Sequence, residues 1–199
     1  MPRFAARLVI LVAAIHLGLS ARARAQSTSC EHPIAGGIQG GMNASTWVGT
    51  DDASIHLGAL FGGFATFHLI DRLALQLELV LSDKGADFED ASGDEVVEAL
   101  LYLEAPVLAR YDLPLSGPVI LHGVAGPGLA WLTDSKRTPT GDLRPLDVTL
   151  TTGVGVDLDA PSHHVSFDLR FGVGLVDAVD DGARKARAVV VTVLGGVTL

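Results

Sequence analysis

The stretch HHVSFDLRFGVGLV, residues 163–176, decides the fold because its side chains alternate between two chemistries. From Val165 onward the odd positions carry large apolar side chains, whereas the even positions carry Ser166, Asp168, Arg170 and two glycines. Successive residues of a β-strand point to opposite faces, so the stretch predicts a strand with one apolar and one polar face. In a soluble sandwich the apolar face would meet a second sheet, whereas in an outer-membrane barrel it meets lipid and the charges point inward.

The N-terminal residues have the parts of a secretory signal peptide. Two arginines precede an apolar run over residues 8–19, and Ala23 and Ala25 are spaced as a signal-peptidase site. The apolar run is shorter than the roughly 18 residues that a membrane-spanning helix needs. We therefore expect residues 1–25 to be a signal peptide and residues 26–199 to form one exported domain.

Composition restricts the class of protein further. The single cysteine, Cys30, cannot form an internal disulfide, so the exported domain must be stable without one. Removal of the four signal-peptide arginines takes the formal net charge from −9 to −13, which argues against nucleic acid or anionic headgroups as partners. Hydrophobic residues make up 48% of the chain, yet no second run is long enough for a spanning helix. Apolar content distributed by alternation is typical of a sheet that faces lipid.

Eight segments of the exported domain alternate in this way. They cover residues 34–45, 54–69, 72–82, 97–112, 118–132, 146–158, 163–176 and 188–199. Two of the segments contain a proline, Pro106 and Pro127, and each proline predicts a bulge or a local break in strand pairing.

The connections between these segments alternate in length. Short links occur at residues 70–71, 112–117 and 159–162, and longer polar links occur at 46–53, 83–95, 133–145 and 177–187. Such alternation is typical of the short periplasmic turns and long external loops of outer-membrane barrels. We predict an all-β fold, a closed eight-stranded antiparallel up-and-down transmembrane β-barrel that leaves no free edge and whose lumen is filled by side chains.

Several motifs occur in order along these segments: GIQGGMNAS at 37–45, LQLELVLSDKG at 75–85, YLEAPVLARY at 102–111, AGPGL at 125–129, FDLRFGVGL at 167–175 and VLGGVTL at 193–199. The first three resemble the G-x-x-x-G-x-N-x-S, Q-x-E-L-x-x-S-x-K-G and Y-L-E-I-P-L-L-x-K-Y strands of the PorT-like outer-membrane β-barrel family. The resemblance implies a barrel fold and an outer-membrane location, and it implies no reaction. Leu199 stands where such barrels usually end on an aromatic residue that engages the barrel-insertion machinery.

Strand parity places a set of charged residues in the lumen. These residues are Glu78, Glu104, Arg110, Asp168 and Arg170. An isolated buried charge is costly, and the planar guanidinium of arginine can satisfy a carboxylate with two bonds. We therefore expect these five residues to form a salt-bridged network that fills the lumen, in preference to a route for substrate or protons.

Histidines suggest two alternative sites. His164 and Ser166 have the H-x-S spacing of the outer-membrane lipid A deacylases, in which the histidine activates the serine. The pair has inward parity beside a short link, where a bulky lipid cannot enter, so we expect no catalytic residue. His56, His68 and His122 also have inward parity, but a metal site would need further ligands at the same depth. We expect these histidines to be hydrogen-bonded fillers, with no metal and no cofactor.

The link at residues 83–95 carries six carboxylates and one lysine, does not match an EF-hand, and is expected to be a solvated external loop. We expect a monomeric outer-membrane protein with a structural or interaction role, exported by its signal peptide. Its expected partners are outer-membrane lipids, lipopolysaccharide and the barrel-insertion machinery. Three alternatives remain open from the sequence: a narrow channel or small-solute binder, a lipid A-modifying enzyme, and a soluble periplasmic sandwich or lipocalin-like carrier.

Overall fold

The computed structural model describes seven stretches of the chain. They are residues 34–49, 54–89, 95–115, 118–135, 145–159, 164–176 and 187–199. The expected signal peptide at residues 1–25 lies outside these stretches. Within them, no helix has the length and apolar character to span a membrane.

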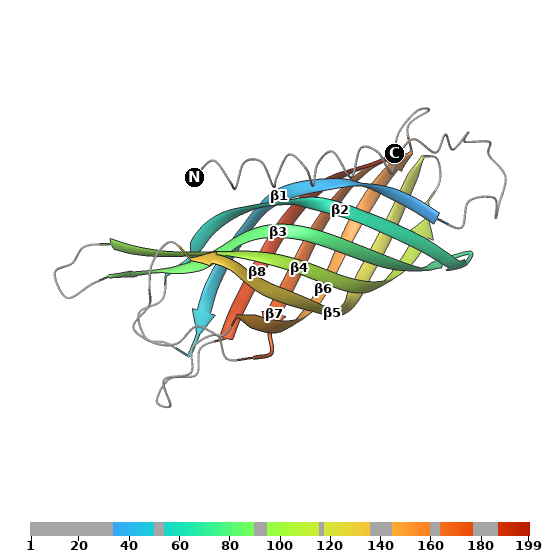
Figure 1. Cartoon of the computed structure of the whole chain (residues 1–199). Helices are drawn as coiled ribbons and strands as arrows, with labels where there is room; N and C mark the ends of the chain where they lie inside the picture. The colour runs from blue at the N-terminus through green and yellow to red at the C-terminus, as the bar shows by residue number, and fades with distance from the viewer. Residues whose placement is uncertain are drawn as a thin grey trace, which may run out of the picture. The chain divides into compact units, whose positions relative to one another are not determined.

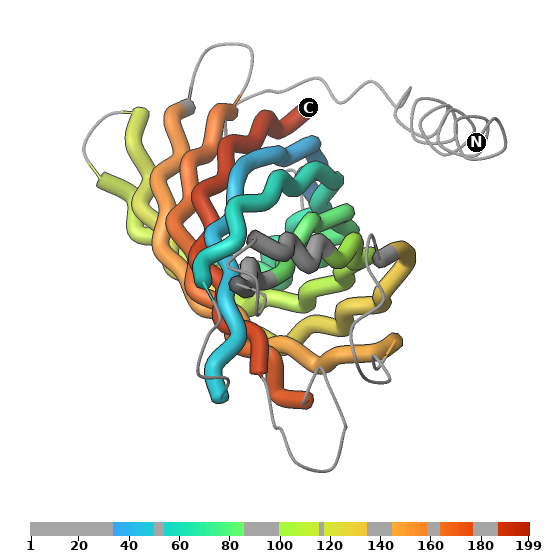
Figure 2. Tube along the Cα trace, turned by 90° about the vertical axis from the view of Figure 1, so that its left-hand side faces the viewer, coloured from blue at the N-terminus to red at the C-terminus, as the bar shows by residue number. Residues whose placement is uncertain are grey.

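The described residues form eight strands that close into one antiparallel barrel (Figure 1). The strands are β1 Ile34–Val48, β2 His56–Ile70, β3 Leu73–Glu89, β4 Glu95–Pro114, β5 Val119–Ser135, β6 Leu146–Asp159, β7 His164–Gly174 and β8 Arg187–Thr198. Each strand pairs with the next along the chain, and β8 pairs back with β1, beside which it lies in Figure 2. The seam runs from Gly37 opposite Thr198 to Val48 opposite Arg187. The predicted fold class is therefore confirmed, and the sheet has no open edge along this seam.

The segment at residues 83–95 differs from the prediction. Strand β3 continues to Glu89 and β4 begins at Glu95, so residues 83–89 and Glu95 of the expected loop belong to paired strands that extend beyond the other strands (Figure 1). Residues 90–94 lie outside the described residues. The ladder is continuous from Asp83 opposite Leu101 to Glu89 opposite Glu95. Backbone N–H and C=O groups are satisfied by such a ladder whatever the charge of the side chains, so the density of acidic residues was a poor loop signal here.

Pro106 and Pro127 interrupt strand pairing without changing its register. The ladder between β4 and β5 skips two residue pairs after Pro106 and resumes in the same register at Ala109 opposite Ala125. Proline has no backbone N–H to donate, which accounts for the missing pairs. The predicted local break is confirmed, whereas the shifts of register lie elsewhere, next to His68 in β2 and between Leu101 and Tyr102 in β4.

The two faces of the barrel have opposite chemistry. Outward side chains are apolar and exposed, as at Phe61, where 60% of the surface is accessible, and Val154, where 64% is accessible. Inward side chains include buried polar and charged groups such as Gln76 and Glu78. Among the described residues no second layer covers the apolar face. The soluble sandwich and the lipocalin-like carrier are therefore wrong, because a soluble fold would bury its apolar side chains.

Candidate functional site

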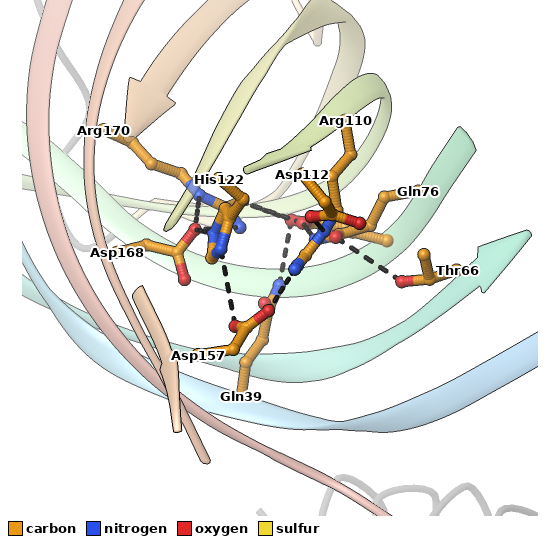
Figure 3. A network of polar contacts seen from close by, with 10 residues as sticks. Gln39, Thr66, Gln76, Arg110, Asp112, His122, Asp157, Asp168 and Arg170 are labelled. Carbon is orange, nitrogen blue, oxygen red and sulfur yellow. Dashed lines mark hydrogen bonds and ion pairs between the residues drawn. The ribbon is translucent and has the colours of Figure 1, made fainter. Parts of the chain in front are cut away.

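A set of buried polar side chains, which we call the central network, joins strands on opposite sides of the lumen (Figure 3). It consists of Gln39, Gln76, Glu78, Asp168 and Arg170. The Nη1 atom of Arg170 on β7 lies 2.9 Å from both carboxylate oxygens of Glu78 on β3. Its Nε and Nη2 atoms donate to Oδ1 of Asp168 at 3.3 and 3.2 Å. Because β3 and β7 lie four places apart in a ring of eight strands, this ion pair crosses the barrel.

The remaining lone pairs of Glu78 are also satisfied. Nε2 of Gln39 on β1 donates to Oε2 of Glu78 at 2.9 Å, and Nε2 of Gln76 donates to Oε1. Glu78 is 7% exposed and Arg170 is 6% exposed, so both charges lie away from water. A buried ion pair is tolerated only where such additional hydrogen bonds satisfy it. The central network therefore fixes β1, β3 and β7 relative to one another.

A second set of side chains, which we call the mouth cluster, lies where the strands approach the short connections. It consists of Arg110, Asp112, His122 and Asp157. Nε of Arg110 donates to Oδ1 of Asp112 at 2.8 Å, and its Nη2 pairs with Oδ2 of Asp157. Nδ1 of His122 lies 3.4 Å from Oδ1 of Asp157, and its Nε2 lies 3.1 Å from Oδ1 of Asp168. His122 therefore connects the mouth cluster to the central network.

Two glycines on β6 provide the space for these side chains. Gly155 is paired with His122 on one side and with Asp168 on the other. A Cβ atom added at Gly155 would overlap the His122 ring, and one at Gly153 would lie 2.7 Å from Cγ of Arg170. Bare backbone at both positions lets the imidazole and the guanidinium lie across β6. A glycine inside a strand often marks such a close approach.

The other end of the lumen, which we call the outer-end chamber, is packed differently. Trp47, Leu100, Tyr102 and Ala130 form an apolar cluster there. Nζ of Lys84 pairs with Oε2 of Glu104 at 2.7 Å, between the neighbouring strands β3 and β4. The cavity beside them measures about 30 Å³. Ligand pockets are typically about 300 Å³ or larger, so this cavity has room for water and not for a metabolite.

The five residues expected to form one network all have side chains on the inward face, at different depths. The structure brings Glu78, Asp168 and Arg170 together, and within the described part of the chain Arg110 is linked to them through Asp157 and His122. Glu104 lies at the outer end, where its partner is Lys84. Parity gives the face of a strand and not the depth along it, which is why the sequence grouped residues that lie apart.

The residues of the alternative sites are placed as follows. Nε2 of His56 lies 3.5 Å from Oδ1 of Asp83, and the exposed His68 places Nε2 4.0 Å from Oδ2 of Asp112. His164 is exposed at the start of β7. Ser166 is partly buried, and its Oγ would lie 2.5 Å from a Cβ atom added at Gly196 of β8. The serine hydroxyl therefore faces the lumen.

Sequence reasoning missed the ligand-type residues around His122. Asp112 and Asp157 each place a carboxylate oxygen at the same depth as the imidazole, on the strands before and after β5. The sequence did carry a signal for them. Inward positions of neighbouring strands lie close together near the three short connections, and Asp112 and Asp157 occupy such positions. The expectation that His122 is a filler overlooked these two carboxylates.

Comparisons with known proteins agree with this architecture. A family model described as the outer membrane protein beta-barrel domain matches residues 24–180. The structure is similar to that of Neisserial surface protein A (NspA), with a TM-score of 0.54 and 13% identity, covering 81% of this chain and 96% of that chain. It is also similar to the outer membrane protein OprG from Pseudomonas aeruginosa, with a TM-score of 0.53 and 14% identity, covering 83% of this chain and 94% of that one. No curated protein matches the chain. The finer resemblance to the PorT-like family stays a prediction.

Proposed function

Because the chain belongs to the family of outer membrane protein beta-barrel domains, it is a small barrel of the outer membrane, and we propose that it has a structural or interaction role there with a closed lumen. The observation that carries this proposal is the ion pair between Arg170 and Glu78, which joins β7 to β3 across the barrel. An ion that passed this level would have to separate buried, fully bonded charges, which is costly. An eight-stranded barrel is ordinarily filled by its own side chains.

The proposed orientation follows from the lengths of the connections. Short turns face the periplasm in barrels of this kind, so the mouth cluster would lie at the periplasmic side and the outer-end chamber at the cell exterior. The long hairpin of β3 and β4 would then extend outward from the cell, where partners are met. The apolar outward face contacts membrane lipid. We further propose that lipopolysaccharide surrounds the external end and that the barrel-insertion machinery delivers the protein to the membrane. The protein would be a monomer and a member of the PorT-like family.

A closed lumen is tested by single-channel recording in planar bilayers. Protein extracted from outer membranes in detergent should insert and give no steady current, with heat-modifiable gel mobility as the check that the barrel is folded. A Glu78→Ala/Arg170→Ala double variant removes the crossing pair without changing the net charge and should conduct more than the wild type. A steady open current from the wild-type protein would reject the closed lumen and favour the narrow channel.

The proposed absence of enzymatic activity rests on the placement of Ser166. Its hydroxyl faces the lumen at the end with short connections, away from the lipid that an acyl-transfer enzyme must reach. Replacement of Ser166 by alanine should leave the acylation of lipid A in the outer membrane unchanged. A change in the lipid A mass spectrum in cells that carry only the Ser166→Ala protein would support the hypothesis that the protein is a lipid A deacylase.

A further inference from the structure

We propose that the mouth cluster binds a first-row divalent metal ion through His122, Asp157 and Asp112. One ligand atom from each of these residues lies within 4.8 Å of the other two. The three residues come from consecutive strands, β5, β6 and β4. Imidazole nitrogen combined with carboxylate oxygen favours transition metals such as Zn²⁺, whereas Mg²⁺ and Ca²⁺ prefer sites made only of oxygen. This inference goes beyond the proposed closed lumen and does not depend on it.

The orientation of the His122 ring is that of a metal ligand. Its Nε2 lies 3.1 Å from Oδ1 of Asp168, and Asp168 is in turn held by Arg170. A carboxylate that accepts the proton of one ring nitrogen leaves the lone pair of the other nitrogen free, as in the carboxylate–histidine–metal arrangement of many metal sites. The other nitrogen, Nδ1, points into the mouth cluster and makes no hydrogen bond among the described residues, although His122 is only 3% exposed.

The separation of the first two ligand atoms already suits a metal. Nδ1 of His122 and Oδ1 of Asp157 are 3.4 Å apart. Two ligands at about 2.0 Å from a tetrahedral Zn²⁺ lie about 3.3 Å apart. Two lone pairs that face one another at this distance repel, so either a ring proton on Nδ1 or a metal ion lies between these two atoms. Asp112 has to come closer than in the present arrangement, in which Arg110 holds its Oδ1.

Arg110 supplies the competing positive charge in the metal-free protein. Its guanidinium is bonded to both Asp112 and Asp157. A divalent ion would neutralise the two carboxylates by itself, so the metal and the guanidinium are alternative positive charges for the same two carboxylates, although Arg110 holds Oδ2 of Asp157 and Oδ1 faces His122. The inference therefore has a definite sign: loss of the guanidinium should strengthen metal binding. His68, whose Nε2 is 4.0 Å from Oδ2 of Asp112, offers a nitrogen ligand for a fourth position.

The test is a titration of the untagged protein, purified from outer membranes in detergent, with Zn²⁺ and separately with Mg²⁺ by isothermal calorimetry. We expect one Zn²⁺ site and no Mg²⁺ site. His122→Gln and Asp157→Asn should each weaken Zn²⁺ binding more than ten-fold, and Arg110→Gln should strengthen it. The matched control is Glu104→Gln, which removes a lumen carboxylate at the other end and should leave the affinity unchanged.

Asp168→Asn tests the positioning of the ring, because loss of such an outer partner typically costs about 10- to 100-fold in metal affinity. The absorption spectrum of bound Co²⁺ gives a second readout, since His122→Gln should change it. Unchanged Zn²⁺ binding in both His122→Gln and Asp157→Asn would overturn the inference by locating the metal elsewhere. Absence of Zn²⁺ binding in both the wild type and Arg110→Gln would overturn it as well, and so would weaker binding in Arg110→Gln.

Discussion

The outward and inward faces of the barrel come from the same strands, and they differ most clearly between two neighbours on β7. Leu169 faces outward with 53% of its surface exposed, whereas Arg170 faces inward, is 6% exposed and is bonded to Glu78 and Asp168. The outward face requires only that a side chain be apolar. The inward face requires particular partners at particular depths. Substitutions on the two faces should therefore be harmful for different reasons.

The largest expected difference is between Arg170→Met and Leu169→Met. Arg170→Met leaves the buried Glu78 and Asp168 without their cation, and breaking a buried pair typically costs about 3–5 kcal/mol in the free energy of unfolding. Leu169→Met preserves an apolar side chain of similar volume and should cost less than about 1.5 kcal/mol. Urea unfolding in lipid vesicles, followed by tryptophan fluorescence, measures both values. Equal and small losses would mean that the lumen charges are hydrated.

A charge introduced on the outward face tests whether that face contacts lipid. Leu79 follows Glu78 on β3 and faces outward with 51% of its surface exposed, and Leu69, at the register shift near the end of β2, is 61% exposed beside a short connection. Leu79→Arg should destabilise the protein by about 2–4 kcal/mol, and Leu69→Arg by about 0–1 kcal/mol, because the cost of a charge falls from the bilayer centre to its surface. The same unfolding assay measures both variants. A cost that did not depend on depth would contradict the contact with lipid.

The smallest expected difference concerns two glycines on neighbouring strands. Gly155→Ala adds a methyl group that overlaps the His122 ring, and overpacking of this kind typically costs about 1–3 kcal/mol. Gly123 faces outward, where the nearest atom to an added Cβ would be the carbonyl oxygen of Gly153 at 3.9 Å. Gly123→Ala should therefore change stability by no more than about 0.5 kcal/mol. If both alanines were equally tolerated, the close approach of His122 to β6 would be wrong.

The fold was predictable because alternation and link length are local properties of the sequence. The segment expected at residues 146–158 differs from strand β6, Leu146–Asp159, by one residue, and the strict alternation of links gave the antiparallel order. The prediction was wrong at residues 83–89 and at Glu95, where charge was taken as evidence for a loop although the backbone ladder continues. A high density of charged side chains indicates that those side chains are hydrated, and it does not exclude strand pairing by the backbone.

The lumen contacts were less predictable because they depend on depth. Parity placed Glu104 and Arg110 on the correct face, yet Glu104 pairs with Lys84 and Arg110 pairs with Asp112 and Asp157. Which charges meet is set by strand register and by the space that β6 leaves open. The alternate glycines Gly153 and Gly155 on the inward side of β6 were the available signal, since glycine in a strand often marks close approach.

The assignment of the two faces can be measured directly with the two tryptophans of the chain. Trp47 is 7% exposed and packs against Tyr102 inside the barrel, whereas Trp131 is 63% exposed on the outward face of β5. Each can be studied alone in vesicles of brominated phospholipid, using Trp131→Phe and Trp47→Phe. The bromine atoms should strongly quench Trp131 and leave the fluorescence of Trp47 nearly unchanged. Equal quenching of both residues, or stronger quenching of Trp47, would contradict a barrel whose apolar face meets lipid and whose polar face encloses the lumen.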